Sequence, residues 1–338
     1  MESEINLVRM SRRTFLGTAS AVTVASSLSH RARATGQASP MMQGIPSNSA
    51  QRIRLAVKFG MVQPGDSEVA PGSESRGTAD HSIRAKFQLL KDLGYDGVEM
   101  DSPSDLDINE VIDASRETDL PIHGVVDSVH WSKPFSHPDA AVRAEGVKAL
   151  ETAIKDCKAL GGTTVLVVPA VVNREVSYAD AYARSQEEIR KVLPIAAENN
   201  ITLAFENVWN NFLLSPLEAA RYVDEFESET GGVKWYFDVG NIVRYGWPAQ
   251  WIRILGPRIA KLDIKEYSRR KANEEGVWKG FEVEIGDPPP EEGCDWPSVR
   301  QALREIGYTG WATAEVGGGG RKRLADIRRR MNGVLNEE

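Results

Sequence analysis

The chain has 338 residues, of which 41% are hydrophobic and 26% are charged, and its formal net charge is −7 at pH 7. These proportions are typical of an ordinary globular protein and exclude a disordered chain or a membrane protein. The basic residues form no stripe interleaved with aromatic residues, so a nucleic acid is not expected as a partner. Two cysteines, Cys157 and Cys294, exclude a disulfide scaffold, and neither has the Cys/His spacing of a zinc site.

The first 34 residues have the layout of a signal sequence. An arginine-containing segment precedes an uncharged run of 16 residues, from Thr14 to Ser29. That run is too short and too weakly apolar for a spanning helix of about 20 residues, so no stable membrane insertion is expected after processing. The segment Ser11-Arg12-Arg13-Thr14-Phe15-Leu16 resembles the twin-arginine export motif, and Ala32-Arg33-Ala34 offers the small residues that a signal peptidase reads.

We therefore expect cleavage after Ala34 and a periplasmic or otherwise exported protein. The alternative is an accidental arginine pair ahead of a disordered tail. Five arginines and two glutamates give residues 1–34 a charge of +3, which leaves −10 for the remainder. Residues 35–51, rich in Gly, Ser, Gln, Pro and Asn, indicate a linker, and residues 52–335 are the expected folded domain.

From Arg52 onward, short apolar and β-branched runs alternate with longer amphipathic segments, which is typical of βα units around a parallel sheet. Length alone allows two domains or one α/β barrel of roughly 250 residues. We count eight units, which favours a single closed (β/α)8 TIM barrel. A doubly wound open sheet is the competitor, but no Gly-x-Gly-x-x-Gly follows any predicted strand. The predicted strands span residues 53–59, 97–100, 122–126, 164–168, 202–206, 234–238, 259–264 and 311–315.

Two helices are clear from the periodicity, over residues 140–160 and 178–199. The first places Leu150, Ile154 and Cys157 on one face, so Cys157 is predicted to lie in the core. Four glycines near the ends of helical segments are expected to adopt the left-handed conformation that ends helices. They are Gly94, Gly161, Gly256 and Gly307.

Two predicted βα connections are long, over residues 60–79 and 267–296. In a barrel such connections lie over the face that carries the active site. A glycine run, residues 317–320, follows the last strand and indicates either a cradle for an anion or a flexible turn.

Acidic residues end four successive predicted strands. They are Glu206, Asp238, Asp263 and Glu315. An ionised carboxylate after an apolar strand is costly unless it is paired, hydrogen-bonded or bound to a metal. Any one of these residues could instead cap a helix or pair with a neighbouring Lys or Arg. Four of them at one barrel mouth would repel one another strongly, so they indicate a divalent cation.

Residues 52–335 resemble the xylose isomerase-like TIM barrels, which include sugar isomerases and epimerases such as D-tagatose 3-epimerase. That resemblance implies one divalent metal ion, held by Glu, Asp, His and Glu at the ends of strands five to eight. Glu206, Asp238 and Glu315 match three of these ligands, and Asp263 occupies the histidine position. The resulting all-oxygen site favours Mn²⁺, with Mg²⁺ or Co²⁺ as alternatives, over zinc.

The resemblance also implies an activity, that of a sugar isomerase or epimerase. A metal that chelates a carbonyl and the adjacent hydroxyl stabilises the ene-diolate formed when the neighbouring C–H loses its proton. Glu206 and Glu315, on opposite sides of the sugar, would serve as base and acid. A small sugar or keto-sugar is the expected substrate, and a homo-oligomer is common in this family.

Five further residues are candidates for substrate binding. Glu99 lies near the end of the second predicted strand. It resembles an acid of the family at this position, which contacts either a substrate hydroxyl or a residue adjacent to the active site. His130 follows the third strand and has either a substrate-binding or a packing role. Trp209 would stack on a sugar face or plug the barrel rim. Lys265 and Arg269 would bind substrate oxygens or balance the carboxylates, and Arg269 matches an arginine near the metal of ketose epimerases.

Two alternatives to a sugar epimerase or isomerase fit the same residues. The same proton abstraction would serve a lyase or dehydratase acting on a keto-sugar or 3-keto-glycoside. With Asp263 in place of histidine, a non-catalytic sugar-binding barrel is also possible. An abasic-site endonuclease of the same family is excluded, because its three zinc ions need many histidines and this chain has five.

Overall fold

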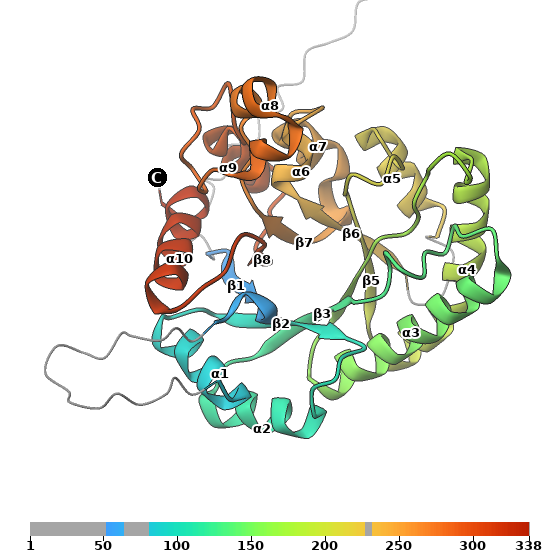
Figure 1. Cartoon of the computed structure of the whole chain (residues 1–338), viewed down its shortest axis with the longest axis horizontal. Helices are drawn as coiled ribbons and strands as arrows, with labels where there is room; N and C mark the ends of the chain where they lie inside the picture. The colour runs from blue at the N-terminus through green and yellow to red at the C-terminus, as the bar shows by residue number, and fades with distance from the viewer. Residues whose placement is uncertain (1–51, 64–80, 227–231, 338) are drawn as a thin grey trace, which may run out of the picture. The chain divides into compact units, whose positions relative to one another are not determined.

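The computed structural model describes residues 52–63, 81–226 and 232–337. The predicted signal sequence, the linker and most of the 60–79 connection lie outside the described residues. Eight parallel strands form a closed barrel in chain order, with helices around it (Figure 1), which confirms the predicted (β/α)8 fold. The strands are β1 (Arg54–Lys58), β2 (Gly97–Ser102), β3 (Ile122–Asp127), β4 (Thr164–Val167), β5 (Thr202–Glu206), β6 (Val233–Asp238), β7 (Ile259–Ile264) and β8 (Trp311–Ala314).

The helices follow the strands along the chain. None in the described part is long and apolar enough to cross a membrane. The α-helices are α1 (Ile83–Asp92), α2 (Ile108–Thr118), α3 (Ala140–Ala159), α4 (Tyr178–Asn199), α5 (Pro216–Asp224), α6 (Val239–Val243), α7 (Pro248–Leu255), α8 (Arg269–Glu275), α9 (Trp296–Glu305) and α10 (Arg321–Leu335), and the 3₁₀ helices are η1 (Phe59–Met61), η2 (Gly256–Arg258) and η3 (Val277–Phe281).

The strand register determines where the acidic residues lie. Asp238 and Asp263 are direct partners across β6 and β7, and Glu206 is the partner of Tyr236 on β6. The backbone N–H of Glu315 donates to the carbonyl of Ile264 at 3.0 Å, which continues the β7–β8 pairing by one residue. Because all eight strands are parallel, their last residues meet at one end of the barrel.

The apolar faces of the outer helices pack against the barrel. On α3, Leu150, Ile154 and Cys157 are fully buried, as predicted. Cys294 is also buried, and both cysteines are free thiols. All four glycines predicted to end helices have positive φ angles.

The glycine run after β8 serves as a structural turn. Gly319 forms a parallel bridge with Val62, and its N–H donates to the carbonyl of Met61 at 3.0 Å. A Cβ atom on Gly318 would lie 2.1 Å from that same carbonyl oxygen. The close approach of two backbones, rather than an anion, therefore explains the glycine at position 318.

Candidate active site

Glu206, Asp238, Asp263 and Glu315, the carboxylate cluster, converge at the mouth of the barrel. Each offers one oxygen atom, and these four atoms lie within 4.8 Å of one another. Glu206, Asp238 and Asp263 are buried, whereas the side chain of Glu315 is 34% exposed. The structure thus brings together the four residues that the sequence indicated as metal ligands.

Asp238 is oriented by the first turn of α6. Its Oδ1 accepts a hydrogen bond from the N–H of Asn241 at 2.7 Å, which is the capping arrangement considered from the sequence. The side chain of Asn207 supports this turn, because its Oδ1 accepts from the N–H of Asp238 at 3.0 Å and its Nδ2 donates to the Asp238 carbonyl at 2.7 Å. Oδ2 of Asp238 is thereby directed into the carboxylate cluster.

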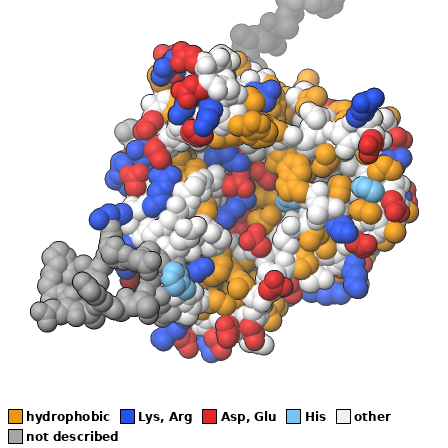
Figure 2. Space-filling view, viewed as in Figure 1, with side chains coloured by type: hydrophobic (Ala, Val, Ile, Leu, Met, Phe, Trp, Pro, Cys, Tyr) orange, Lys and Arg blue, Asp and Glu red, His pale blue; other side chains and the backbone are white. Residues whose placement is uncertain are grey.

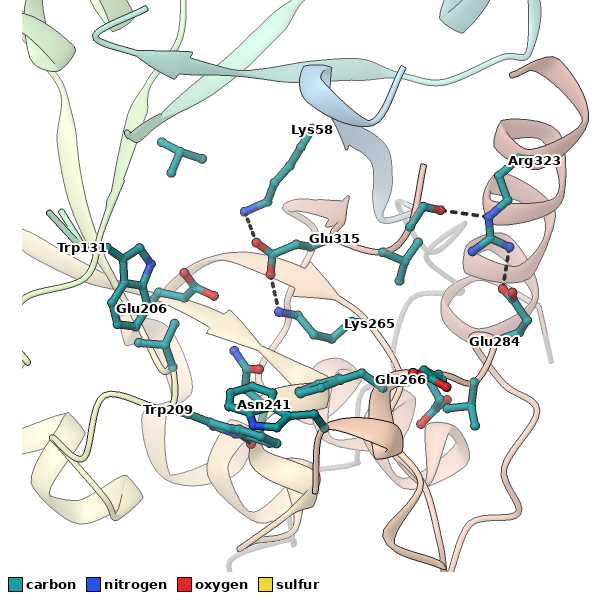
Figure 3. Close-up of a pocket in the computed structure, with 18 of the residues that line it drawn as sticks. Lys58, Trp131, Glu206, Trp209, Asn241, Lys265, Glu266, Glu284, Glu315 and Arg323 are labelled. Atoms are coloured by element: carbon teal, nitrogen blue, oxygen red, sulfur yellow. Dashed lines mark hydrogen bonds and ion pairs between the residues drawn. The ribbon is translucent and has the colours of Figure 1, made fainter. Parts of the chain in front are cut away.

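Two lysines balance part of the negative charge. Lys58, the last residue of β1, lies 3.0 Å from Asp263 Oδ2 and 2.9 Å from Glu315 Oε1. Lys265 lies 2.9 Å from Asp238 Oδ2 and forms a second ion pair with Glu315. Figure 3 shows the Glu315 carboxylate held between the two ammonium groups, with Glu206 facing it across the site.

The carboxyl groups of the cluster differ in pKa. Burial, together with repulsion from Glu315 and Asp263, raises the pKa of Glu206 well above its usual range. Burial likewise raises the pKa of Asp263, and that of Asp238 to about 6. Glu315 is the exception, because Lys58 and Lys265 outweigh its burial and lower its pKa. The cluster therefore combines a strongly basic carboxylate, Glu206, with a weakly basic one, Glu315.

The donor atoms of the cluster fit a divalent cation. Oε1 of Glu206 and Oδ1 of Asp263 are buried with neither a hydrogen-bond nor an ion-pair partner among the described residues, whereas Oδ2 of Asp238 and Oδ2 of Asp263 each contact only a lysine. Such atoms are costly in a folded protein unless a cation approaches them. When all four carboxyl groups are ionised, they and the two ammonium groups carry a net charge of −2, which one divalent ion would neutralise.

The cluster opens into a cavity of about 800 Å³, which we call the inner cavity. Figure 2 shows this face hollowed at its centre, with acidic and basic side chains at the bottom. Its volume lies in the upper range of small-molecule sites. The residues that line it are Lys58, Val126, His130, Trp131, Glu206, Val208, Trp209, Asn241, Lys265, Glu266, Trp278, Phe281, Glu282, Val283, Glu284, Glu315, Val316, Gly317 and Arg323.

Three of the predicted substrate-binding residues line this cavity. They are His130, Trp209 and Lys265. Burial lowers the pKa of His130 to about 3, and its Nδ1 accepts a hydrogen bond from the N–H of Val168 at 3.4 Å. The imidazole ring therefore lines the cavity in its neutral form at pH 7. The indole of Trp209 is held by a hydrogen bond of 2.9 Å from its Nε1 to the carbonyl of Asn241.

Glu99 and Arg269 do not line the inner cavity. Glu99 is buried beneath the cluster, where its Oε1 accepts from the hydroxyl of Tyr236 at 2.8 Å and its Oε2 lies 3.9 Å from Lys58. Arg269 donates to the carbonyl of Gly246 at 2.7 Å and packs over the ring of Trp247 at 4.1 Å. These contacts draw its guanidinium away from the carboxylates that it was expected to approach.

Several charged residues that line the inner cavity were not identified from the sequence, and Lys58 and Glu266 are the two with the most contacts to explain. Lys58 ends an apolar strand, as the acids of the cluster do, and that position was the available signal. Glu266 directly follows β7 and is 1% exposed. Its carboxylate accepts hydrogen bonds from the N–H groups of Gly286 and Cys294, both at 2.9 Å, and from Trp296 Nε1 at 2.7 Å. Glu266 therefore holds the long connection between β7 and α9 in place.

Comparison with known proteins agrees with this architecture. Residues 87–334 match the family model described as xylose isomerase-like TIM barrel. An L-ribulose-5-phosphate 3-epimerase, UlaE of Escherichia coli O1:K1 / APEC, is 24% identical over 237 residues, which cover 67% of this chain and 78% of that protein.

Solved structures of sugar epimerases share the fold. A D-psicose 3-epimerase structure determined in the presence of D-fructose has a TM-score of 0.64 and 18% identity, and the match covers 85% of this chain and all of that one. The apo form of the 3-keto-D-glucoside 4-epimerase YcjR from E. coli has a TM-score of 0.62 and 16% identity, covering 84% of this chain and 99% of that one. The similar proteins named here are thus enzymes of the isomerase class.

Proposed function

Because this chain belongs to the xylose isomerase-like TIM barrel family, we propose that it is a metal-dependent sugar epimerase that removes a proton from the carbon next to a carbonyl group. The observation that carries the proposal is the convergence of four carboxylates within 4.8 Å, in which the buried Oε1 of Glu206 and Oδ1 of Asp263 have no partner among the described residues. The names of the similar enzymes, which are sugar 3-epimerases and a keto-glucoside 4-epimerase, support the same chemistry.

Glu206, Asp238, Asp263 and Glu315 would hold the metal ion. An all-oxygen donor set suits a hard cation, for which we propose Mn²⁺, with Mg²⁺ or Co²⁺ as alternatives. When bound, such an ion polarises the substrate carbonyl and stabilises the negative charge that develops on its oxygen.

The side chains of this chain would share the remaining steps. Glu206, which no ion pair joins to a lysine among the described residues, is the freer proton acceptor and would remove the proton from the carbon beside the carbonyl, whereas both lysines pair with Glu315. Glu315, on the opposite side of the cluster, is ionised, so the proton that it returns to the other face must come from the ammonium group of Lys58 or Lys265, both of which pair with its carboxylate. Removal from one face and return from the other inverts the stereocentre of the ene-diolate carbon.

A second candidate function is a lyase or dehydratase acting on a keto-sugar or 3-keto-glycoside. The fold that this chain shares with a 3-keto-D-glucoside 4-epimerase supports a keto-glycoside as the substrate of such a reaction. Both reactions begin with the same proton abstraction, and they differ in whether a group is expelled afterwards.

We also propose that the substrate is unphosphorylated and that the enzyme is exported. A phosphate group is usually bound by several cations or N–H donors. Arg323 is the one arginine among the described residues that line the inner cavity, and its charge is already paired with Glu284 at 2.6 Å. The twin-arginine-like N-terminus supports export to the periplasm. Mass spectrometry of the protein recovered from cells should show a chain that begins at Thr35, and a chain that keeps residues 1–34 would argue against processing.

The decisive experiment combines metal analysis with isotope exchange. The purified protein should contain Mn²⁺ or a similar ion, and it should incorporate solvent deuterium beside the carbonyl of a ketose in D₂O. Products from free ketoses and from 3-keto-glycosides would then separate an epimerase from a lyase. If no ion is bound and no deuterium is incorporated into the ketose, both enzymatic proposals fail. The protein would then be a non-catalytic sugar-binding barrel.

A further inference from the structure

We infer that a second cavity beside the inner one is a carbohydrate subsite, which takes a second sugar ring glycosidically linked to the reacting ketose. This outer cavity has a volume of about 430 Å³. The inference rests on the proposed function, because it assigns the reacting ring to the inner cavity. It extends that function by naming the substrate class as a disaccharide or other glycoside rather than a free monosaccharide.

The two cavities adjoin each other. They share three lining residues, Val208, Trp209 and Trp278, so the side chains of Trp209 and Trp278 stand between them. The ring centroids of these two tryptophans are 4.8 Å apart. Trp209 lies at the lower edge of the inner cavity in Figure 3, on the side away from Lys58. A ligand in the inner cavity therefore needs to extend only past this aromatic pair to reach the outer one.

The outer cavity presents apolar surface that the protein leaves uncovered. Trp278 is 68% exposed, Leu214 is 54% exposed and Tyr245 is 43% exposed. Exposed aromatic side chains grouped around a cavity are characteristic of binding sites. A pyranose ring has an apolar face of C–H groups and a rim of hydroxyls, which suits an amphipathic wall of Trp and Tyr.

Arg244 supplies the cationic group of the outer cavity, which Asn211 and Tyr245 also line. Its guanidinium carbon lies 4.8 Å from the ring centroid of Trp209, so the group is oriented by stacking. No ion pair joins Arg244 to a carboxylate among the described residues, in contrast to Arg323, which pairs with Glu284. Its N–H donors are therefore available to the hydroxyl groups of a bound ring.

The balance of these groups favours a sugar ring over a phosphate group. A phosphate site is built from several N–H donors or cations that converge on one point. Arg244 is the one charged side chain among the described residues that line the outer cavity, and the others are Val208, Trp209, Asn211, Leu214, Tyr245 and Trp278. Its walls thus suit a broad ring with one polar edge better than a compact dianion.

Paired ketoses test the inference directly. Dissociation constants of the full-length, Mn²⁺-loaded protein should be measured for D-fructose, for the glycosyl-fructoses lactulose and palatinose, whose fructose unit keeps its free carbonyl, and for D-fructose 6-phosphate. We expect one of the disaccharides to bind about tenfold more tightly than D-fructose, as one additional ring contact would provide. Saturation-transfer NMR should show contact at the non-ketose ring of that disaccharide.

Two leucines near the cavity provide a matched pair of variants. Leu214→Ala removes a wall of the outer cavity, whereas Leu217→Ala removes a 70% exposed leucine that lines neither cavity. Leu214→Ala, and more strongly Tyr245→Ala, should reduce the preference for the disaccharide, and Leu217→Ala should leave it unchanged.

Three outcomes would overturn the inference. Equal affinities for D-fructose and for both disaccharides would reject the outer subsite while leaving the proposed function intact. A preference for D-fructose 6-phosphate that is lost in Arg244→Ala would identify a phosphate site instead. Failure of every ketose to bind, with no deuterium exchange, would reject the proposed function itself and the inference with it.

Discussion

Two buried glutamates at the mouth of the barrel have opposite environments. Glu266, just after β7, is surrounded by donors, with three hydrogen bonds of 2.7–2.9 Å from Gly286, Cys294 and Trp296. Glu206, at the end of β5, has a buried oxygen that accepts none, and it faces other carboxylates. The first environment stabilises a charge in order to hold the chain in place. The second leaves a charge uncompensated, which is typical of a site that binds a cation or moves a proton.

The same substitution should therefore have opposite effects at the two glutamates. Glu206→Gln removes the proposed proton acceptor and should reduce deuterium exchange into a ketose by about 10²- to 10⁴-fold. Because it also removes repulsion within the carboxylate cluster, the thermal unfolding temperature of the metal-free protein should stay the same or rise. Exchange at the wild-type rate would show that Glu206 is not the base.

Glu266→Gln should instead destabilise the fold. An amide has one acceptor oxygen where the carboxylate has two, so buried N–H donors of the β7–α9 connection would be left unpaired. We expect a loss of about 2 kcal/mol in the free energy of unfolding, measured by urea denaturation. A loss below about 0.5 kcal/mol, within the range of ordinary surface substitutions, would mean that Glu266 does not hold this connection.

The stability of the metal-free protein should depend on pH because of the carboxylate cluster. The pKa of Asp238 is raised to about 6, and those of Glu206 and Asp263 are raised as well. A carboxyl group with a raised pKa binds its proton more tightly in the folded state. Its contribution to stability is therefore lost as the pH rises, between about pH 4 and 6 for Asp238.

Mn²⁺ should restore the stability that is lost at higher pH, because the ion takes the place of the protons on the carboxyl groups of the cluster. We expect excess Mn²⁺ to raise the unfolding temperature more at pH 7.5 than at pH 5, because protons compete for the same oxygens. At about 100 times its dissociation constant, the ion would contribute about 2.7 kcal/mol. Asp263→Asn is the matched control and should weaken the effect. An equal shift at both pH values would contradict a site formed by these carboxylates.

The smallest effect is expected at Arg269, which the structure places outside the inner cavity. Its guanidinium is bound to the carbonyl of Gly246 and packed over Trp247. Arg269→Ala should change the kcat/KM for exchange by less than about twofold and cost about 1 kcal/mol or less of stability. A loss of activity comparable to that of Glu206→Gln, without a loss of stability, would place Arg269 in the active site after all.

The barrel and the carboxylate cluster could both be predicted from the amino-acid sequence. Each strand is a short apolar run, and Glu206, Asp238, Asp263 and Glu315 each come at the end of one or just after it. In a barrel of parallel strands, the last residues of all strands meet at the same end. The local sequence patterns and this rule were therefore sufficient to predict that the four acids lie together.

The partners of these side chains could not be predicted in the same way, because they depend on how distant segments come together. Lys58 reaches Glu315 because β1 closes the barrel beside β8, a pairing of segments more than 250 residues apart that no local pattern records. Arg269 turns away because backbone carbonyls and Trp247 capture it, and Gly318 is required because Met61 passes against it. The physical reason is the same in each case. A strand or helix follows from the periodicity of its own residues, whereas the partner of a long, flexible side chain depends on what the rest of the chain brings within its reach.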